Sequence, residues 1–299
     1  MIYWTTQARG LVRLTRWREY VPFVIPATLA GVTLALTRSG GAPDLRVLLV
    51  LAANILVVAY AFMINDIEDA PDDARDPARA RRNPVTSGEV TPLMAWASSL
   101  AVAALTVVLY LMCGPRVFLV GVFGLALAHL YSWKPVRLKA WPALDVISHA
   151  LMLSALLVLA GYVTYDASPG PAWLVILGAF AGSAYGQLYN QLRDLEMDRA
   201  AGLHNTAVMT GERLTRALMY GAVAGAVACG AAALLAGLIP LWLVGAGLVI
   251  LPLILLLLRP QVDMRGSAAV DASGRLQIQA NVFLIVITLI WFAGVALGP

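Results

Sequence analysis

Charged residues are scarce in this sequence of 299 residues. Asp, Glu, Lys and Arg make up 13% of the chain, hydrophobic residues make up 60%, and the mean hydropathy is +0.78. Soluble domains carry about 25% charged and roughly 45–50% apolar residues. The shortage of charge therefore excludes an ordinary soluble domain and indicates a membrane protein.

Cysteine and histidine are also rare. Cys113 and Cys229 lie far apart, within or next to apolar stretches, so they predict neither a disulfide framework nor a zinc site. His129, His149 and His204 have no metal-ligand spacing with one another or with a cysteine. A zinc or haem site is therefore not expected.

Long stretches without any charged residue fill most of the chain. Eight such stretches lie at 20–37, 47–65, 90–115, 117–133, 146–165, 167–192, 217–258 and 276–299. A membrane-spanning helix needs about 20 residues, so the stretch 217–258 must hold two helices, with a break at Gly237–Pro240. The sequence therefore predicts an all-α membrane protein with nine transmembrane helices.

Lys and Arg are unevenly distributed among the predicted connections. The N-terminal segment and the second, fourth, sixth and eighth connections hold 18 of them, and only Arg38, Arg46 and Arg116 lie elsewhere. Cations of short loops stay on the cytoplasmic side of a membrane. We therefore expect an integral protein, of the cytoplasmic membrane if the source is prokaryotic, with a cytoplasmic N-terminus and an external C-terminus. The net charge of +4 follows from this topology and gives no support to nucleic-acid binding.

One pattern of polar residues occurs twice, 125 residues apart. The two copies consist of Tyr60, Asn65, Asp69 and Asp73, and of Tyr185, Asn190, Asp194 and Asp198. Each reads N-x-x-x-D-x-x-x-D and lies where a long apolar stretch ends, in the second and the sixth predicted helix. This offset indicates two four-helix repeats plus one further helix, within a single domain over 1–299. Repeats of this kind usually place the binding site between them.

The repeated pattern predicts a metal and phosphate site. At spacings of four residues the polar side chains share one helix face, although Pro71 makes the helix before Asp73 less certain than its counterpart in the second copy. Carboxylates at a helix C-terminus repel one another and the helix dipole, so a cation must compensate them. Mg²⁺ prefers a few carboxylates, waters and substrate phosphates. Two facing clusters would suit a diphosphate bridged by two Mg²⁺ ions, whereas a single acidic cluster would more simply be a helix end in water.

Basic residues occupy the neighbouring connections. Arg79, Arg81 and Arg82 follow the first acidic cluster, and Lys134, Arg137 and Lys139 follow the fourth predicted helix. Basic runs beside a membrane commonly set topology or contact lipid headgroups. Beside paired metal sites they are also candidates for binding diphosphate oxygens, and we expect this of Arg82.

Aromatic residues gather at the same ends of predicted helices two, four and six: Tyr60, Phe62, Tyr131, Tyr185 and Tyr189. Such residues are either interface anchors or the π faces of a chamber for a carbocation. Except for Tyr131, we assign them to the tail or acceptor of a substrate. Asp145 opens the fifth predicted helix just after the basic connection, so it either stabilises that helix end or contacts the substrate.

Four segments resemble, in this order, the motifs of the UbiA superfamily of intramembrane prenyltransferases. They are 65–73 (NDIEDAPDD), 82–88 (RNPVTSG), 131–139 (YSWKPVRLK) and 194–202 (DLEMDRAAG). The resemblance covers residues from about 16 to 298 and falls on the four expected cytoplasmic connections. One departure is Asn83, where many members have proline after the arginine.

The resemblance implies a ring of nine helices around a central cavity, capped by the motif-bearing loops on the cytoplasmic side. It implies Mg²⁺-dependent transfer of an isoprenyl group from a prenyl diphosphate to a lipophilic acceptor, which we expect to be an aromatic quinone precursor. The implied metal ligands are Asn65, Asp69, Asp73, Asp194 and Asp198, the four aspartates being catalytic. The repeat adds Asn190, for metal or diphosphate, and the first cluster adds Asp66. Lys134, Arg137 and Lys139 would neutralise the diphosphate, with Tyr131 nearby.

Other functions remain open at this point. A membrane terpene cyclase of the same superfamily would use the same metal sites without an external acceptor. An ion-coupled transporter could use repeated acidic helices, but its charges should lie nearer the bilayer midplane. A CDP-alcohol phosphotransferase is not supported, because its D-G-x-x-A-R signature is absent.

Overall fold

The computed structural model describes residues 2–200, 202–258 and 272–298, and these residues form helices and connections without any strand. The α-helices are α1 (Ile2–Leu14), α2 (Trp17–Ser39), α3 (Leu45–Asp73), α4 (Pro77–Arg82), α5 (Pro92–Cys113), α6 (Pro115–Ser132), α7 (Leu144–Ala150), α8 (Leu156–Val163), α9 (Trp173–Arg193), α10 (Leu195–Ala200), α11 (Thr206–Leu235), α12 (Leu241–Leu257) and α13 (Ala272–Leu297). A π-helical segment, Leu151–Ala155, joins α7 to α8, and Leu138–Ala140 and Gly170–Ala172 are short 3₁₀ turns.

Among the described residues, seven helical segments are long and apolar enough to cross a membrane: α2, α3, α5, α6, the continuous helix Leu144–Val163, α11, and Ile278–Leu297 of α13. The shorter helix α12 is also apolar. The predicted break at Gly237–Pro240 is confirmed, because α11 ends at Leu235 and α12 begins at Leu241. Helix α9 is not among the seven, since its second half carries polar residues between Ser183 and Gln191. The count of nine spans therefore stays a prediction.

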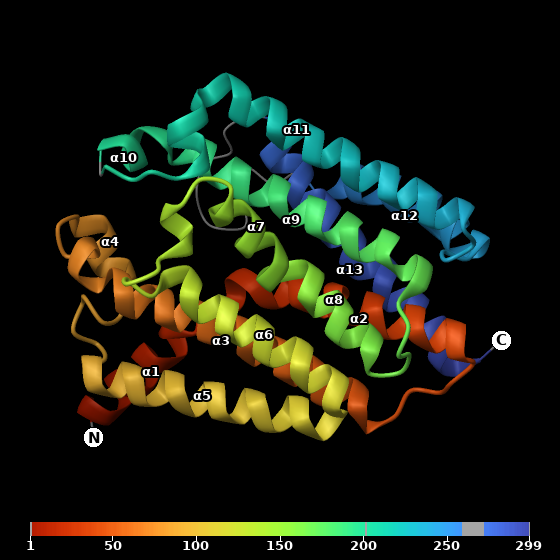
Figure 1. Ribbon diagram of the computed structural model, residues 1–299, viewed down its shortest axis with the longest axis horizontal. Helices are drawn as coiled ribbons and strands as arrows, with labels where there is room; N and C mark the ends of the chain where they lie inside the picture. Colours follow the sequence, from red (N-terminus) through yellow and green to blue (C-terminus); the bar gives the residue numbers. More distant parts are fainter. Residues whose placement is uncertain (1, 201, 259–271, 299) are drawn as a thin grey trace.

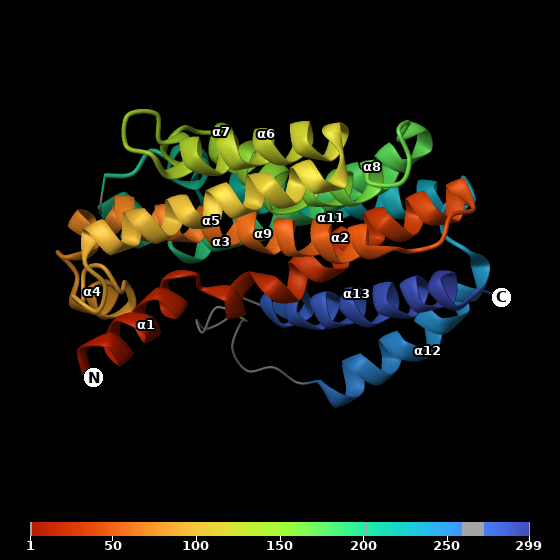
Figure 2. The same ribbon diagram turned by 90° about the horizontal axis from the view of Figure 1, so that it is seen from below.

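The connections that carry the motifs lie at one end of the helix bundle. Figure 1 shows α4, α10 and the N-terminus at this end and the C-terminus at the other, and Figure 2 shows the same for α4 and the two termini. Of the predicted eighth connection, 259–275, the part 259–271 lies outside the described residues. The N-terminus, α4 and α10, which are distant in the sequence, thus lie at one end of the bundle, where they can contribute to a common site.

The close contact between α2 and α8 organises the interior of the bundle. A Cβ atom at Gly31 would lie 2.0 Å from the carbonyl oxygen of Val158, and one at Gly161 would lie 2.4 Å from that of Thr28. The amide of Asn54, in α3, donates hydrogen bonds to the Thr28 hydroxyl (2.8 Å) and to the Leu157 carbonyl (3.1 Å). Small residues let helix backbones approach closely in membranes, and here buried hydrogen bonds add a third helix to the contact.

The opposite end of the bundle is joined by a cluster around Asp44. Its carboxylate accepts hydrogen bonds from Arg46 and from the Tyr165 hydroxyl, and the Arg46 guanidinium lies 4.6 Å from the centre of the Tyr165 ring. The hydrogen bond from Arg46 is the main cause that lowers the pKa of Asp44 from its ordinary 3.8 to about 2.

A pH-dependent stability follows from this cluster. A lowered pKa means that the folded protein is stabilised when Asp44 is ionised; this contribution is present above pH 3.8 and is lost as the pH falls through about 2. We expect Asp44→Asn to lower the melting temperature slightly at neutral pH, because the carboxylate is about half exposed and screened. The difference between variant and wild type should shrink as melting curves are recorded toward pH 2. A constant difference over this range would contradict the assignment.

Candidate active site

The first acidic cluster meets the basic connection directly. The ammonium of Lys139 lies 2.9 Å from Oδ1 of Asn65 and 2.5 Å from Oδ2 of Asp69. The guanidinium of Arg137 donates to Asp69 Oδ1 (3.1 Å) and to Asp72 (3.3 Å). The predicted complementary charge is therefore in place on the helix face shared by Asn65 and Asp69.

Burial and charge act against each other at Lys139. Burial lowers the pKa of this lysine, and contact with Asp69 opposes the shift. Ser132 donates a further hydrogen bond to the side-chain oxygen of Asn65 (3.2 Å). The site thus presents hard oxygen atoms that already surround a positive charge.

Helix α3 continues through Pro71 and ends at Asp73. The irregularity instead occurs in the second copy, where α9 ends at Arg193 and Asp194 has a non-helical backbone (φ −94°, ψ 5°) before α10 begins. The prediction that the helix is less certain in the first copy than in the second is therefore wrong. Pro71 lies in the last turn of α3, where the Thr86 hydroxyl bonds to the Ala70 carbonyl.

The second acidic cluster is arranged around its own partners. The guanidinium of Arg193 donates to both carboxylate oxygens of Asp194, each at 3.0 Å. Asp198 accepts a hydrogen bond from the amide of Asn205 (2.7 Å). Burial raises the pKa of Asp198, and the charge of Arg79 in α4 opposes this shift. The connection after α3 therefore acts electrostatically on the second cluster.

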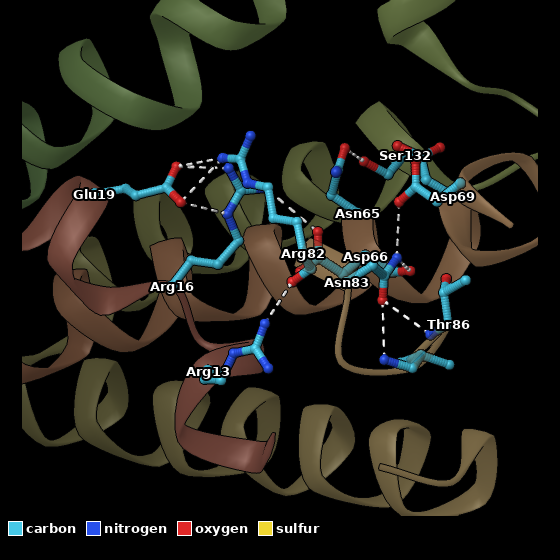
Figure 3. Close-up of polar contacts among 12 residues, drawn as sticks. Arg13, Arg16, Glu19, Asn65, Asp66, Asp69, Arg82, Asn83, Thr86 and Ser132 are labelled. Carbon is cyan, nitrogen blue, oxygen red and sulfur yellow. Dashed lines mark hydrogen bonds and ion pairs between the residues drawn. The ribbon is translucent and has the colours of Figure 1, made fainter. Parts of the chain in front are cut away.

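Three of the predicted residues lie in a separate cluster around Arg16. Asp66 is buried and accepts from Arg16 (3.3 Å), whose guanidinium lies 4.7 Å from the centre of the Phe62 ring. Arg82 donates to Glu19, another partner of Arg16. Figure 3 shows Arg16, Glu19 and Arg82 together, apart from Asn65 and Asp69.

Two of the predicted residues, Asp66 and Phe62, face Arg16 and Tyr20 in the structure. Asp66 lies one residue beyond Asn65, about 100° around the helix, so its side chain is directed to Arg16 instead of the shared face of Asn65 and Asp69. Phe62 is four residues before Asp66 and occupies the same side, stacked on Tyr20 with 5.4 Å between ring centres. The assignment of Asp66 to the metal and of Phe62 to the substrate stays a prediction. Arg82 is paired with Glu19 in the structure, although its side chain is more than half exposed.

Asp145 is a buried structural carboxylate. Its oxygens accept hydrogen bonds from the backbone of Val146 (2.8 Å), the amide of Gln191 (2.7 Å), and both the backbone (2.6 Å) and hydroxyl of Thr206. The side chain joins α7, α9 and the start of α11, and the residue has no exposed surface. These four bonds use its acceptor capacity and hold these helices together, and its contact with a substrate stays a prediction.

The remaining aromatic residues lie on α3, α6 and α9. The Tyr60 hydroxyl is 2.9 Å from Nδ1 of His129, and the Tyr131 hydroxyl accepts from Gln187 (3.1 Å). The rings of Tyr185 and Tyr189 lie 6.2 Å apart. Lys134 is exposed, and its backbone N–H donates to Glu68. These positions are compatible with the predicted roles and do not test them.

Several residues of the site had no signal in the motif search. Arg16, Gln191, Asn205 and Thr206 lie outside the repeated pattern, and Asn83 stood out only as a departure from a motif. Arg16, Gln191 and Thr206 contact residues 46 or more positions away, whereas Asn83 and Asn205 contact Asp73 and Asp198 ten and seven positions away. The one signal visible in the sequence is that an asparagine, Asn83 or Asn205, follows each acidic cluster within ten residues.

Comparison with known proteins places these features in context. The model of the UbiA prenyltransferase family matches residues 24–273. The chain is 34% identical over 173 residues to the lycopene elongase/hydratase of Haloferax volcanii, a match that covers 55% of this chain and 54% of that protein. It is 28% identical over 178 residues to the 4-hydroxybenzoate octaprenyltransferase of Shewanella amazonensis, covering 59% of each. The matches thus span a little over half the length of these two relatives.

A solved structure shares the fold over nearly the whole chain. It is that of a UbiA homologue from Archaeoglobus fulgidus bound to GPP and Mg²⁺, with a TM-score of 0.73 and 24% sequence identity. The likeness covers 97% of this chain and all of the other. At this identity it establishes the arrangement of helices.

Proposed function

Because this chain belongs to the UbiA prenyltransferase family, we propose that it is an Mg²⁺-dependent membrane enzyme that transfers an isoprenyl group from a prenyl diphosphate to a lipophilic acceptor. The observation that carries the proposal is the contact of Lys139 with Asn65 and Asp69, together with that of Arg137 with Asp69. It unites two separate motifs into one site for a metal and an anion.

The residues present fit Mg²⁺. Lys139 places a cation between two hard oxygen atoms, those of Asn65 and Asp69. Among the described residues no three His, Cys, Asp or Glu side chains form a common metal-binding group. Mg²⁺ ordinarily uses one or two carboxylates and completes its shell with waters and substrate phosphates. Asn65, Asp69 and Asp73 on one side, and Asn190, Asp194 and Asp198 on the other, would hold two ions in this way.

The basic residues would change partners when the substrate binds. Lys139, Arg137 and Arg193 are paired with carboxylates, and diphosphate oxygens offer the same charge-assisted hydrogen bonds. Bound Mg²⁺ would supply charge neutralisation for the departing diphosphate. Lys139 and Arg137 would then orient the diphosphate, with Lys134 and Tyr131 close by in sequence.

The transfer itself needs a dry chamber. The allylic C–O bond breaks, its electron pair leaves with the diphosphate, and the cation forms a bond to an electron-rich acceptor that then loses a proton. Apolar helices would hold the tail and exclude water, and Tyr60, Tyr185 and Tyr189 would offer π faces to the cation. We propose the family's ring of nine spans for this chamber.

The orientation follows from the cation distribution, with the motif-bearing end and the N-terminus in the cytoplasm. Eighteen cations against three favour it. A reporter enzyme that functions only outside the cytoplasm should be active when fused to the C-terminus. Activity after fusion within the connection 194–205, with none at the C-terminus, would reverse the orientation.

The decisive experiment uses purified protein in lipid nanodiscs. Geranyl, farnesyl and geranylgeranyl diphosphates are supplied with Mg²⁺ or with EDTA, and with 4-hydroxybenzoate, lycopene or a lipid extract of the source. The names of the relatives motivate both acceptors, one aromatic and one a polyene. We expect a prenylated product, identified by mass spectrometry, only with Mg²⁺. Diphosphate release with a cyclised hydrocarbon would indicate a terpene cyclase, and ion flux without turnover would indicate a transporter.

A further inference from the structure

Each acidic cluster ends in an aspartate that is held by an asparagine of the following connection. The amide of Asn83 donates to Oδ2 of Asp73 (2.9 Å), and the amide of Asn205 donates to Oδ2 of Asp198 (2.7 Å). Both asparagines are buried, with 2% and 5% of their surface exposed. They follow their aspartates at different distances, ten and seven residues, so the contact is shared by the two halves although the spacing is not.

Both amides have one possible orientation. Oδ1 of Asn83 accepts from the backbone of Val85 (3.0 Å) and Thr86 (3.4 Å), and Oδ1 of Asn205 accepts from the backbone of Val208 (3.0 Å) at the start of α11. A reversed amide would place oxygen against a carboxylate and N–H against N–H. The nitrogen must therefore face the aspartate in each case.

The two asparagines are themselves fixed to the helices. The amide of Asn83 also donates to the backbone carbonyl of Asp66 (2.7 Å) in α3, as Figure 3 shows. Asn205 precedes Thr206, which bonds to the buried Asp145. Each carboxylate is thus oriented by an asparagine that is itself fixed to the helices.

A neutral partner has a different consequence from a charged one. Asp69 and Asp194 are paired with cations, which compete with a metal ion for the same charge. An amide orients a carboxylate without adding a positive charge of its own. Within the described part of the chain, no hydrogen bond to Oδ1 of Asp73 or Asp198 is found, so one oxygen of each remains available to a metal.

We propose that Asn83 and Asn205 are a pair of positioning residues that orient Asp73 and Asp198, the last carboxylate of each cluster, for Mg²⁺. This inference rests on the proposed function, in which these aspartates are metal ligands. It assigns a role to Asn83, the departure from the family motif, and extends the duplication to residues outside the repeated pattern.

The test separates the contact to the aspartate from the support of the helix end. Asn205→Ser and Asn205→Thr keep an oxygen that can cap α11 but cannot reach Asp198 as the amide does. Asn83→Ser keeps an oxygen for the backbone N–H groups of Val85 and Thr86 and removes the amide that donates to Asp73. Thr91→Ala is the matched control, because Thr91 caps α5 through the backbone of Met94 and bonds to no acid.

Metal binding is measured first, by electron paramagnetic resonance of Mn²⁺ with inorganic diphosphate. We expect the dissociation constant to rise about tenfold or more in each asparagine variant and to stay at the wild-type value in Thr91→Ala. In turnover assays the half-saturating Mg²⁺ concentration should rise similarly, while the rate at saturating Mg²⁺ approaches that of wild type. If Asn83→Ser does not fold, the Asn205 variants decide the question.

Unchanged Mn²⁺ and Mg²⁺ dependence, with a melting temperature lowered as in Thr91→Ala, would overturn the inference and leave the proposed function intact. Wild-type protein that binds Mn²⁺ but does not consume any prenyl diphosphate would overturn the proposed function, and the Mn²⁺ data would still decide the role of the asparagines. Wild-type protein that binds no Mn²⁺ would overturn both.

Discussion

Asp69→Ala is expected to abolish prenyl transfer while the protein still folds. Asp69 joins Lys139 and Arg137 to the face that carries Asn65, so its removal takes a charged metal ligand and the centre of the ion-pair network. Loss of one group that stabilises developing charge commonly costs about a hundredfold or more in rate. Product formation at saturating Mg²⁺, measured by mass spectrometry, is the readout.

Two companion variants make this result specific. Asp69→Asn keeps the shape and removes only the charge, and we expect a similar loss of rate. Asp72→Asn removes another partner of Arg137, but Asp72 does not belong to the repeated pattern and its side chain is 38% exposed. It should keep a rate within about threefold of wild type, since partly exposed ion pairs contribute little. Wild-type turnover in either Asp69 variant would refute the metal assignment.

Gly31→Ala should be the most destabilising small substitution in the helix bundle. The new Cβ would lie 2.0 Å from the carbonyl oxygen of Val158 and 2.8 Å from the backbone nitrogen of Tyr162. These are backbone atoms, so relief requires α2 and α8 to separate. Overpacking costs about 1–3 kcal/mol and occasionally more, and separation would also stretch the buried bonds of Asn54 to both helices.

Thermal unfolding in detergent measures this effect. We expect Gly31→Ala, and likewise Gly161→Ala, to lower the melting temperature by roughly 5 °C or more. Gly182→Ala is the control, because a Cβ on this residue of α9 meets no atom within 4 Å and alanine favours the helix. Equal melting temperatures for Gly31→Ala and Gly182→Ala would show that the contact between α2 and α8 is not tight.

The sequence predicted the helices well because their evidence is local. The absence of charge over about 20 residues located the long helices, and glycine and proline marked the break between α11 and α12. Length and composition support seven spans among the described residues, compared with the nine predicted. Helix α9 is not among the seven, because the polar residues of its second half lower its hydropathy. Local patterns were less successful at helix ends, where α3 passes Pro71 and α9 stops before Asp194.

The candidate site was predictable only in part. Spacing along one helix correctly placed Asn65 and Asp69 on one face, and charge balance correctly indicated that the basic connection would meet them. The burial of Asp145 under Thr206 and the pairing of Asp66 with Arg16 were not predictable, because each depends on a segment that folds back from 50 or more residues away.

The sequence by itself determined the class of the protein, its family and the types of side chain in its site, because hydrophobicity, helical periodicity and repeated motifs are properties of short segments. The tertiary structure alone decided which carboxylates face cations, which face amides and which are buried for support. A carboxylate has the same chemistry in every chain, but its partner is set by the docking of helices and connections that are remote in the sequence. Asn83 and Asn205 illustrate this, because only the folded chain brings each of them to the last aspartate of its cluster.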